Sequence, residues 1–205
     1  MTEILLYVSA ALVSYLISGL NPAIILSNLI YKRDIRNEGS GNPGFTNFKR
    51  VFGNKFAWFV FALDIIKAAI PFVIFGFLFD KYLDARQFGV AYAGVFAFLG
   101  HVFPCWYGFK GGKGFLVNLA TIWFIDWRAG VIATVVMVVL VLVIKYMSVA
   151  TMVALVLAAI SLLVFTVDSI WIFAMYMCCV LFMIYKHKEN IKRLMNGTES
   201  KFHLK

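Results

Sequence analysis

The sequence predicts an all-α integral membrane protein with about seven membrane-spanning helices, an external N-terminus, a cytoplasmic C-terminus and a short amphipathic C-terminal helix. Three observations support this fold class. The 205 residues are 62% hydrophobic, with a mean hydropathy of +0.87, far above the apolar share of an ordinary soluble domain. The apolar residues gather in seven long segments. The basic residues lie almost entirely in the connections on one side, as the positive-inside rule describes.

The apolar segments follow one another along the chain, and a full membrane span needs about 20 apolar residues. The predicted segments are 3–30, 56–79, 88–103, 115–127, 130–144, 149–167 and 170–185. Gly and Pro in 18–22 are expected to kink or break the first segment. The fourth segment is short, so we expect it to begin below the membrane surface. Merged segments, or a re-entrant fourth segment, are alternatives that change the count by one or two.

The orientation follows from the basic residues. With seven segments, only Lys81, Arg86 and Arg128 fall in the connections on one side of the membrane, and Lys67 lies inside a segment. The other side therefore faces the cytoplasm and the N-terminus lies outside. The start of the chain lacks the basic region of a cleaved signal peptide, so the first segment should stay in the membrane. The basic side carries Lys32, Arg33, Arg36, Lys49, Arg50, Lys55, Lys110, Lys113, Lys145, Lys186, Lys188, Lys192, Arg193, Lys201 and Lys205.

The composition also limits the domain organisation and the ligands. No linker or change of composition separates a second domain, so residues 1–205 are expected to form a single polytopic membrane domain. The net charge of +9 is spread over short loops, which favours anionic lipids and phosphate-bearing metabolites over nucleic acid. The three cysteines show neither CxxC spacing nor a set of histidine partners, so we expect no metal site and no structural disulfide.

Residues 100–114, with the sequence GHVFPCWYGFKGGKG, hold five glycines and two lysines between two apolar segments. Glycine lets backbone N–H groups approach a ligand closely, and a helix that starts after the cluster would add its dipole. Lys113 would add a positive charge suited to phosphate. The cluster therefore predicts an anion site, and the alternative is a flexible interfacial loop whose lysines meet lipid head groups.

Two further polar clusters fall on the same predicted side. Residues 39–50, with the sequence GSGNPGFTNFKR, combine turn-forming glycines with short hydrogen-bonding side chains and with Arg50, which can bind phosphate bidentately. The alternative is a turn at a helix start, with Ser or Asn as N-cap and Pro43 near the first helical position.

Residues 186–201, with the sequence KHKENIKRLMNGTESK, form the third cluster. His187 and Asn190 are three apart and would share one face of a helix, which Asn196-Gly197 would end. The alternative is a short amphipathic helix that holds the tail against the membrane. Within the second segment, Asp64 and Lys67 are also three apart, and we expect them to form a structural ion pair.

Together, the three clusters resemble the three motifs of the bacterial acyl-phosphate:glycerol-3-phosphate acyltransferases of the PlsY type. Order, spacing and membrane context all match, and the resemblance spans essentially the whole chain. Phe45 stands where that family usually has a small residue, and Ser200 where it usually has Pro. Neither departure changes a polar group of the motifs.

The resemblance implies a reaction. A fatty acyl group passes from acyl phosphate to the sn-1 hydroxyl of glycerol 3-phosphate, giving lysophosphatidic acid and phosphate in the first acylation of bacterial phospholipid synthesis. It implies no cofactor, and a site on the cytoplasmic side of the bacterial cytoplasmic (inner) membrane. The implied partners are glycerol 3-phosphate, fatty acyl phosphate, membrane lipids and, transiently, the soluble enzyme that forms acyl phosphate.

The resemblance also implies roles for residues. Ser40, Gly-rich backbone N–H groups and Lys113 would hold the donor phosphate, and Arg50 with Lys113 or Lys110 would bind the glycerol phosphate. His187, oriented by Asn190, would position or deprotonate the attacking hydroxyl, unless a substrate phosphate takes the proton. The predicted catalytic residues are Ser40, His187 and Asn190, and the predicted substrate-binding residues are Gly39, Gly41, Asn42, Thr46, Asn47, Arg50, His101, Lys110, Gly111, Gly112, Lys113, Gly114 and Glu199.

Two other functions are the alternatives. A transporter of an anionic metabolite would explain the broken first segment and the intramembrane charges, but no inverted repeat is visible in the sequence. A lipid-binding scaffold would explain the basic loops, but it gives no reason for Ser40, His187 and Asn190.

Overall fold

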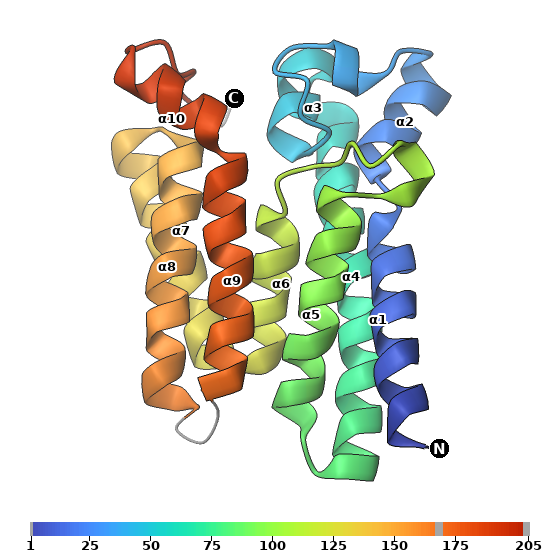
Figure 1. Ribbon diagram of the computed structural model, residues 1–205. Coiled ribbons are helices and arrows are strands. Elements are labelled where there is room, and N and C mark those ends of the chain that lie inside the picture. Colours follow the sequence, from blue (N-terminus) through green and yellow to red (C-terminus); the bar gives the residue numbers. More distant parts are fainter. Residues whose placement is uncertain (1, 167–169, 203–205) are drawn as a thin grey trace.

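The computed structural model describes residues 2–166 and 170–202, and this part of the chain is a bundle of α-helices (Figure 1). The residue Val167, the predicted end of the sixth segment, lies outside the described residues. The helices are α1 (Glu3–Gly19), α2 (Pro22–Tyr31), α3 (Phe45–Phe52), α4 (Asn54–Leu83), α5 (Arg86–Val102), α6 (Phe115–Ile125), α7 (Trp127–Ile144), α8 (Met147–Phe165), α9 (Ile170–Lys186) and α10 (Lys188–Met195).

The helices match the seven predicted apolar segments in order. Five helical stretches in the described residues have the length and hydropathy to cross a membrane, and α9 with α10 adds a sixth although the pair bends by 51°. The remaining segment, α6, has only 11 residues, so the expectation of a short fourth segment is confirmed. The short amphipathic C-terminal helix is also present, as α10.

The predicted break in the first segment is confirmed between α1 and α2. Asn21 caps α2, because its Oδ1 accepts from the Ile24 N–H at 3.0 Å, and Pro22 occupies the first helical position. The Asn21 side chain also donates to the Pro43 carbonyl at 3.1 Å. The break therefore ties α2 to the loop that precedes α3.

The bundle has two halves, which are joined by α6 and by the packing of α5 against α9. The helices α1, α4 and α5 pack together on one side, and α7, α8 and α9 form the other (Figure 1). The central helix α6 contacts α4 and α5 as well as α7, α8 and α9. The close approach of α1 and α5 requires Gly100, because a Cβ there would lie 2.1 Å from the Tyr15 carbonyl oxygen.

Short structures gather at one end of the bundle. The helices α2, α3 and α10 and the loop 103–114 lie at the same end, opposite the N-terminus (Figure 1). All three polar sequence clusters fall here. The fold therefore brings together three motifs that are separated by about 50 and 70 residues of largely apolar helix.

Candidate active site

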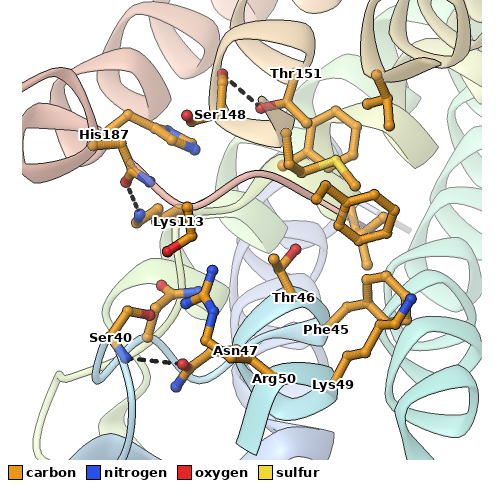
Figure 2. A pocket seen from close by; sticks show the side chains of 18 of the residues that line it. Ser40, Phe45, Thr46, Asn47, Lys49, Arg50, Lys113, Ser148, Thr151 and His187 are labelled. Atoms are coloured by element: carbon orange, nitrogen blue, oxygen red, sulfur yellow. Dashed lines mark hydrogen bonds between the residues drawn. The ribbon is translucent and has the colours of Figure 1, made fainter. Parts of the chain in front are cut away.

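A cavity of about 850 Å³ lies at this end of the bundle, where residues of α3, α4, α6, α7, α8 and α10 meet. Figure 2 shows Ser40, Thr46, Asn47 and Arg50 along one side and Lys113, Ser148, Thr151 and His187 along the facing side. The predicted site residues that line the cavity are Gly39, Ser40, Asn42, Thr46, Asn47, Arg50, His101, Lys113, Gly114, His187, Asn190 and Glu199.

Four predicted site residues do not line the cavity: Gly41, Lys110, Gly111 and Gly112. Lys110 is exposed on the outer part of its loop. The N–H groups of Gly111 and Gly112 donate to the carbonyls of Val102 and His101, at 3.2 and 3.1 Å. A Cβ at Gly112 would lie 2.2 Å from His101 Nε2. These two glycines therefore fold the loop back onto α5, and their backbone donors are used inside the protein.

The first cluster is shaped by Asn47. Its Oδ1 accepts from the Ser40 N–H at 2.9 Å, and its Nδ2 donates to the Glu38 carbonyl at 2.9 Å. Gly39 has a φ of +57°, and a Cβ there would meet Asn47 Oδ1 at 2.4 Å. Asn47 thereby holds the loop around the exposed Ser40, whose side chain faces the cavity (Figure 2).

The alternative in which Ser or Asn is the N-cap of the helix that begins within the first cluster, α3, is wrong. The N-cap of α3 is Gly44, which offers no side chain, and Phe45 rather than Pro43 begins the helix. Thr46, Asn47 and Arg50 follow on α3 and line the cavity. Arg50 is exposed, and its guanidinium has no ion-pair partner among the residues that the structure describes. It is therefore able to bind an anion.

The second cluster ends in the start of α6. Gly114 is the N-cap of α6 with a φ of +86°, and a Cβ there would lie 2.3 Å from the Phe98 ring. Gly114, Phe115 and Leu116 all line the cavity, so the first turn of α6 directs its N-terminus toward it. This arrangement agrees with the expectation of a helix N-terminus beside an anion site.

Lys113 lies just before α6, where its ammonium group donates to the Asn190 side-chain oxygen. Burial, followed by repulsion from Arg193, lowers the pKa of Lys113 from its usual range to about 8. A nearby anion would reverse this effect, because it would stabilise the charged form. Lys113 is thus a cation that gains from binding a phosphate group.

In the third cluster, His187 is buried at the bend between α9 and α10, and its side chain faces the cavity (Figure 2). The Met183 carbonyl lies 2.8 Å from Nδ1. A carbonyl only accepts, so Nδ1 carries the hydrogen and Nε2 is left as the acceptor of the neutral ring. His187 is therefore arranged to take a hydrogen bond or a proton from a hydroxyl group.

Glu199 organises the rest of the third cluster. Its carboxylate accepts from Ser148 Oγ at 2.9 Å, from Asn190 Nδ2 at 2.6 Å and from Arg193 Nε at 2.7 Å. Its side chain is only 8% exposed. Burial raises the pKa of Glu199, but the bonds from Asn190, Arg193 and Ser148 outweigh it and hold the pKa below its usual range. Glu199 thus holds the side-chain amide of Asn190, whose oxygen accepts a hydrogen bond from Lys113.

Sequence reasoning missed Ser148, Thr151 and Arg193 as residues of the cavity wall. Ser148 and Thr151 are single hydroxyl residues in an apolar segment, so the sequence gives them no distinguishing pattern. Arg193 did carry a signal, because it follows Asn190 by three residues and shares its helix face.

The predicted ion pair between Asp64 and Lys67 is confirmed at 2.8 Å. Lys67 Nζ also donates to the Leu20 carbonyl at 2.7 Å and lies 3.0 Å from His101 Nδ1, which accepts. Its three hydrogens therefore meet a carboxylate, a carbonyl freed by the end of α1 and an imidazole. His101 lines the cavity, and its carbonyl accepts from the Gly112 N–H at 3.1 Å, so it also helps to shape the second cluster.

The described residues contain no group of three or more His, Cys, Asp or Glu side chains that could hold a metal ion. The cavity instead carries more cationic than acidic side chains. Its cations include Arg50, Lys113 and Arg193, and its carboxylates are those of Asp64 and Glu199.

The fold and the site define a class of protein: a polytopic membrane protein whose cavity joins a cationic end to an apolar wall. Comparison with known proteins then gives the family. Residues 8–197 match the family model described as glycerol-3-phosphate acyltransferase, and the chain belongs to this family. The resemblance carried by the three motifs is thereby confirmed.

Individual relatives agree. The glycerol-3-phosphate acyltransferase of Francisella philomiragia is 36% identical over 188 residues, which cover 92% of this chain and 89% of the relative. That of Francisella tularensis subsp. holarctica is 35% identical over 193 residues, covering 94% and 91%.

Two solved structures have the same fold. One is a crystal structure of PlsY (YgiH), an integral membrane glycerol 3-phosphate acyltransferase, in its glycerol 3-phosphate form. It superposes with a TM-score of 0.87 and 30% identity over 96% of both chains. The lysophosphatidic acid form gives a TM-score of 0.83 and 28% identity over 96% of this chain and 95% of the other. This chain is therefore a multi-pass integral membrane protein.

Proposed function

We propose that this protein transfers a fatty acyl group from an acyl phosphate to the sn-1 hydroxyl of glycerol 3-phosphate. The hydroxyl oxygen attacks the acyl carbon, the bond from that carbon to the phosphate oxygen breaks, and the hydroxyl proton leaves. The products are lysophosphatidic acid and inorganic phosphate. The observation that carries the proposal is one cavity that combines several cations, an imidazole acceptor and an apolar wall.

The related solved structures support the identity of the acceptor and the product. They are forms of PlsY with glycerol 3-phosphate and with lysophosphatidic acid. The acceptor phosphate fits between Arg50 and Lys113, which approach from α3 and from the loop before α6. A guanidinium can bind a phosphate bidentately, and an ammonium adds a second charge.

The donor phosphate fits the other part of the cationic end. Ser40 offers a hydroxyl group, Lys113 a shared charge, and the first turn of α6 its free N–H groups. An acyl phosphate is a mixed anhydride and therefore already activated. A site that orients two anions and stabilises the departing phosphate is sufficient, and no covalent intermediate is required.

His187 receives the proton of the attacking hydroxyl in this account. Its Nδ1 is bound to the Met183 carbonyl, and burial and the charge of Lys113 lower the pKa of His187 to about 4, so Nε2 of the neutral ring is the free acceptor. Asn190 holds Lys113 beside it. The single domain 1–205 would perform this chemistry without a cofactor.

We further propose that the cavity opens on the cytoplasmic side of the bacterial cytoplasmic membrane. All three motifs lie at one end of the bundle, together with most of the lysines and arginines. Both substrates would then reach the cavity from the side on which they are made, and the soluble enzyme that forms acyl phosphate could deliver it there.

The proposal is tested with the purified protein in detergent micelles, supplied with labelled glycerol 3-phosphate and one donor at a time. Palmitoyl phosphate should give 1-acylglycerol 3-phosphate and one phosphate per turnover, whereas palmitoyl-CoA and palmitoyl carrier protein should give none. Turnover with either thioester alone, or acylation at the second hydroxyl, would refute the proposed donor or position. Absence of all acylation would leave transport or lipid binding as the function.

The cationic end can be tested in the same assay. Lys113→Ala and Arg50→Ala should each raise the KM for glycerol 3-phosphate. Lys192→Ala is a matched control, because Lys192 is an exposed cation on α10 that does not line the cavity. An equal effect of all three substitutions would indicate general surface attraction rather than a built site.

A further inference from the structure

One wall of the cavity is formed by three aromatic rings. Phe45 is the first residue of α3, and Trp58 and Phe61 lie on the first turns of α4. The Phe45 ring centroid lies 5.0 Å from that of Trp58 and 5.5 Å from that of Phe61. Such contacts hold the ring of Phe45 in place. The three residues are called the aromatic wall below.

The aromatic wall is short and has a polar floor. From Trp58 the lining face of α4 passes through Phe61 to Asp64, a rise of roughly 9 Å along the helix. Asp64 is paired with Lys67, beside His101. An alkyl chain would not extend past these charges, because burying apolar groups against them gains nothing and disturbs their bonds. On the α4 side, the apolar lining of the cavity therefore ends within two helical turns.

The cavity opens toward the sides of the bundle. Trp58 is 53% exposed, and across the cavity Val138 and Leu142 of α7 are 44% and 57% exposed. Apolar side chains exposed on a membrane-spanning helix face lipid. A long alkyl chain that starts at the cationic end must therefore leave between α4 and α7 and continue in the bilayer.

Phe45 stands where such a chain would leave the cationic end. It directly precedes Thr46 on α3, and both line the cavity (Figure 2). Its neighbour Gly44 has no side chain, so the Phe45 ring is the apolar group of α3 that lines the cavity beside Thr46. Groups on the first carbons of an acyl chain would meet this ring, and later carbons would not.

We infer that Phe45 is a specificity-determining residue for the acyl donor, which selects chains that are unbranched next to the carbonyl carbon. The rest of the chain lies in lipid, so total chain length is discriminated weakly. This inference rests on the proposed function, because it requires an acyl donor in the cavity. It adds which feature of the donor is recognised and by which side chain.

The experiment compares palmitoyl phosphate with 2-methylpalmitoyl phosphate in competition, using the purified wild type, Phe45→Ala and Phe59→Ala. Phe59 is a matched control, since it is on α4 beside Trp58 but is 60% exposed and does not line the cavity. One methyl group in a tight apolar site changes kcat/KM by roughly 10-fold or more. The wild type and Phe59→Ala should prefer the unbranched donor by at least that factor, and Phe45→Ala should lose most of the preference.

Chain length provides a second readout. Myristoyl and stearoyl phosphate should be used with similar kcat/KM by all three proteins. Phe45→Leu keeps an apolar contact with Trp58, and it covers the case in which the alanine variant does not fold; its preference should lie between those of the wild type and Phe45→Ala.

The possible outcomes separate the two proposals. If both Phe45 variants keep the wild-type preference, Phe45 is not the determinant and the inference is wrong. A steep dependence on chain length would likewise overturn it, because the chain would then be enclosed along its length. If the wild type uses no acyl phosphate at all, the proposed function fails, and the inference fails with it.

Discussion

Lys113 and His187 illustrate how the surroundings of a side chain prepare it for chemistry. Lys113 is half-buried beside other cations, and its pKa is about 8. His187 has one ring nitrogen bound to a carbonyl, which leaves the other as an acceptor. Neither property is a feature of the residue type alone, because both depend on which groups the fold places around the side chain.

The lowered pKa of Lys113 predicts how activity depends on pH. As the pH rises through about 8, the empty site loses the ammonium charge that attracts phosphate. The kcat/KM for glycerol 3-phosphate should therefore fall above that pH. Lys113→Arg keeps its charge throughout, since a guanidinium is not deprotonated in proteins, and should lack this fall. The same fall in both proteins would mean that Lys113 is not the titrating group.

The lowered pKa of Glu199 predicts that the stability of the folded protein depends on pH. Its pKa is held below the usual value of 4.5, so the stabilisation is fully present above that pH and is lost as the pH falls through the lower, folded-state value. Glu199→Gln should unfold at a lower temperature than the wild type at pH 7, and the gap should narrow at pH 4. Thermal unfolding in detergent measures both, and a gap that is constant with pH would contradict the assignment.

At the scale of single residues, the sequence identified most of the polar side chains that line the cavity, but not the partners of each group. Ser40, Arg50 and His187 were predictable because their residue types in glycine-rich or amphipathic stretches have few structural uses. That Gly111 and Gly112 bond to α5 was not predictable, since a glycine in a loop serves a ligand or a neighbouring carbonyl equally well.

Among the elements, the junction of α1 and α2 shows how a polar group is accommodated at membrane depth. The helix ends at Gly19, which frees the Leu20 carbonyl, and Lys67 of α4 donates to that carbonyl. Asp64 balances the lysine charge. The break is therefore held by a buried ion pair on another helix as well as by the Asn21 cap and Pro22 at the start of α2.

This arrangement predicts an asymmetry between single and double substitutions. Lys67→Met leaves the Asp64 carboxylate buried without its partner, which costs about 3–5 kcal/mol in comparable buried pairs. The double variant Asp64→Asn with Lys67→Met removes both charges and should recover part of that loss. Unfolding of both variants in detergent measures the difference. A double variant that is less stable than Lys67→Met would contradict the pairing as the source of stability.

Helix positions were largely predictable from the sequence. Apolar runs and Gly-Pro breaks locate α1, α2 and α4 to α9 within a few residues. The start of α3 at Phe45 was less evident, because Gly44 caps it without a side chain and Pro43 suggested an earlier start. Boundaries of this kind depend on tertiary contacts, here the bond from Asn21 to Pro43.

For the whole molecule, the packing of the two bundle halves around α6 explains the position of the cavity. The helix α6 is too short to cross a membrane, so its first turn lies within the cavity wall. The sequence predicted the short helix and the common side of the motifs. It did not predict the aromatic wall, because α3 and α4 meet only in three dimensions.

The proposed topology can be tested with cysteine labelling. In a variant without Cys105, Cys178 and Cys179, one new cysteine is placed at Thr2 and another at the exposed Met195. In intact inner-membrane spheroplasts, a membrane-impermeant maleimide should label the first site directly and the second only after permeabilisation. The reverse pattern would place the cavity on the external side.

The central claim is that three motifs far apart in the sequence form one catalytic cavity. The most direct test is the kcat of purified Ser40→Ala and His187→Ala with palmitoyl phosphate and glycerol 3-phosphate, with thermal unfolding as the check of folding. A general base contributes roughly 100-fold or more to a rate, so we predict that His187→Ala loses at least that factor while it stays folded. Ser40→Ala should also lose most of its activity. Folded variants that both retain wild-type activity would contradict the claim.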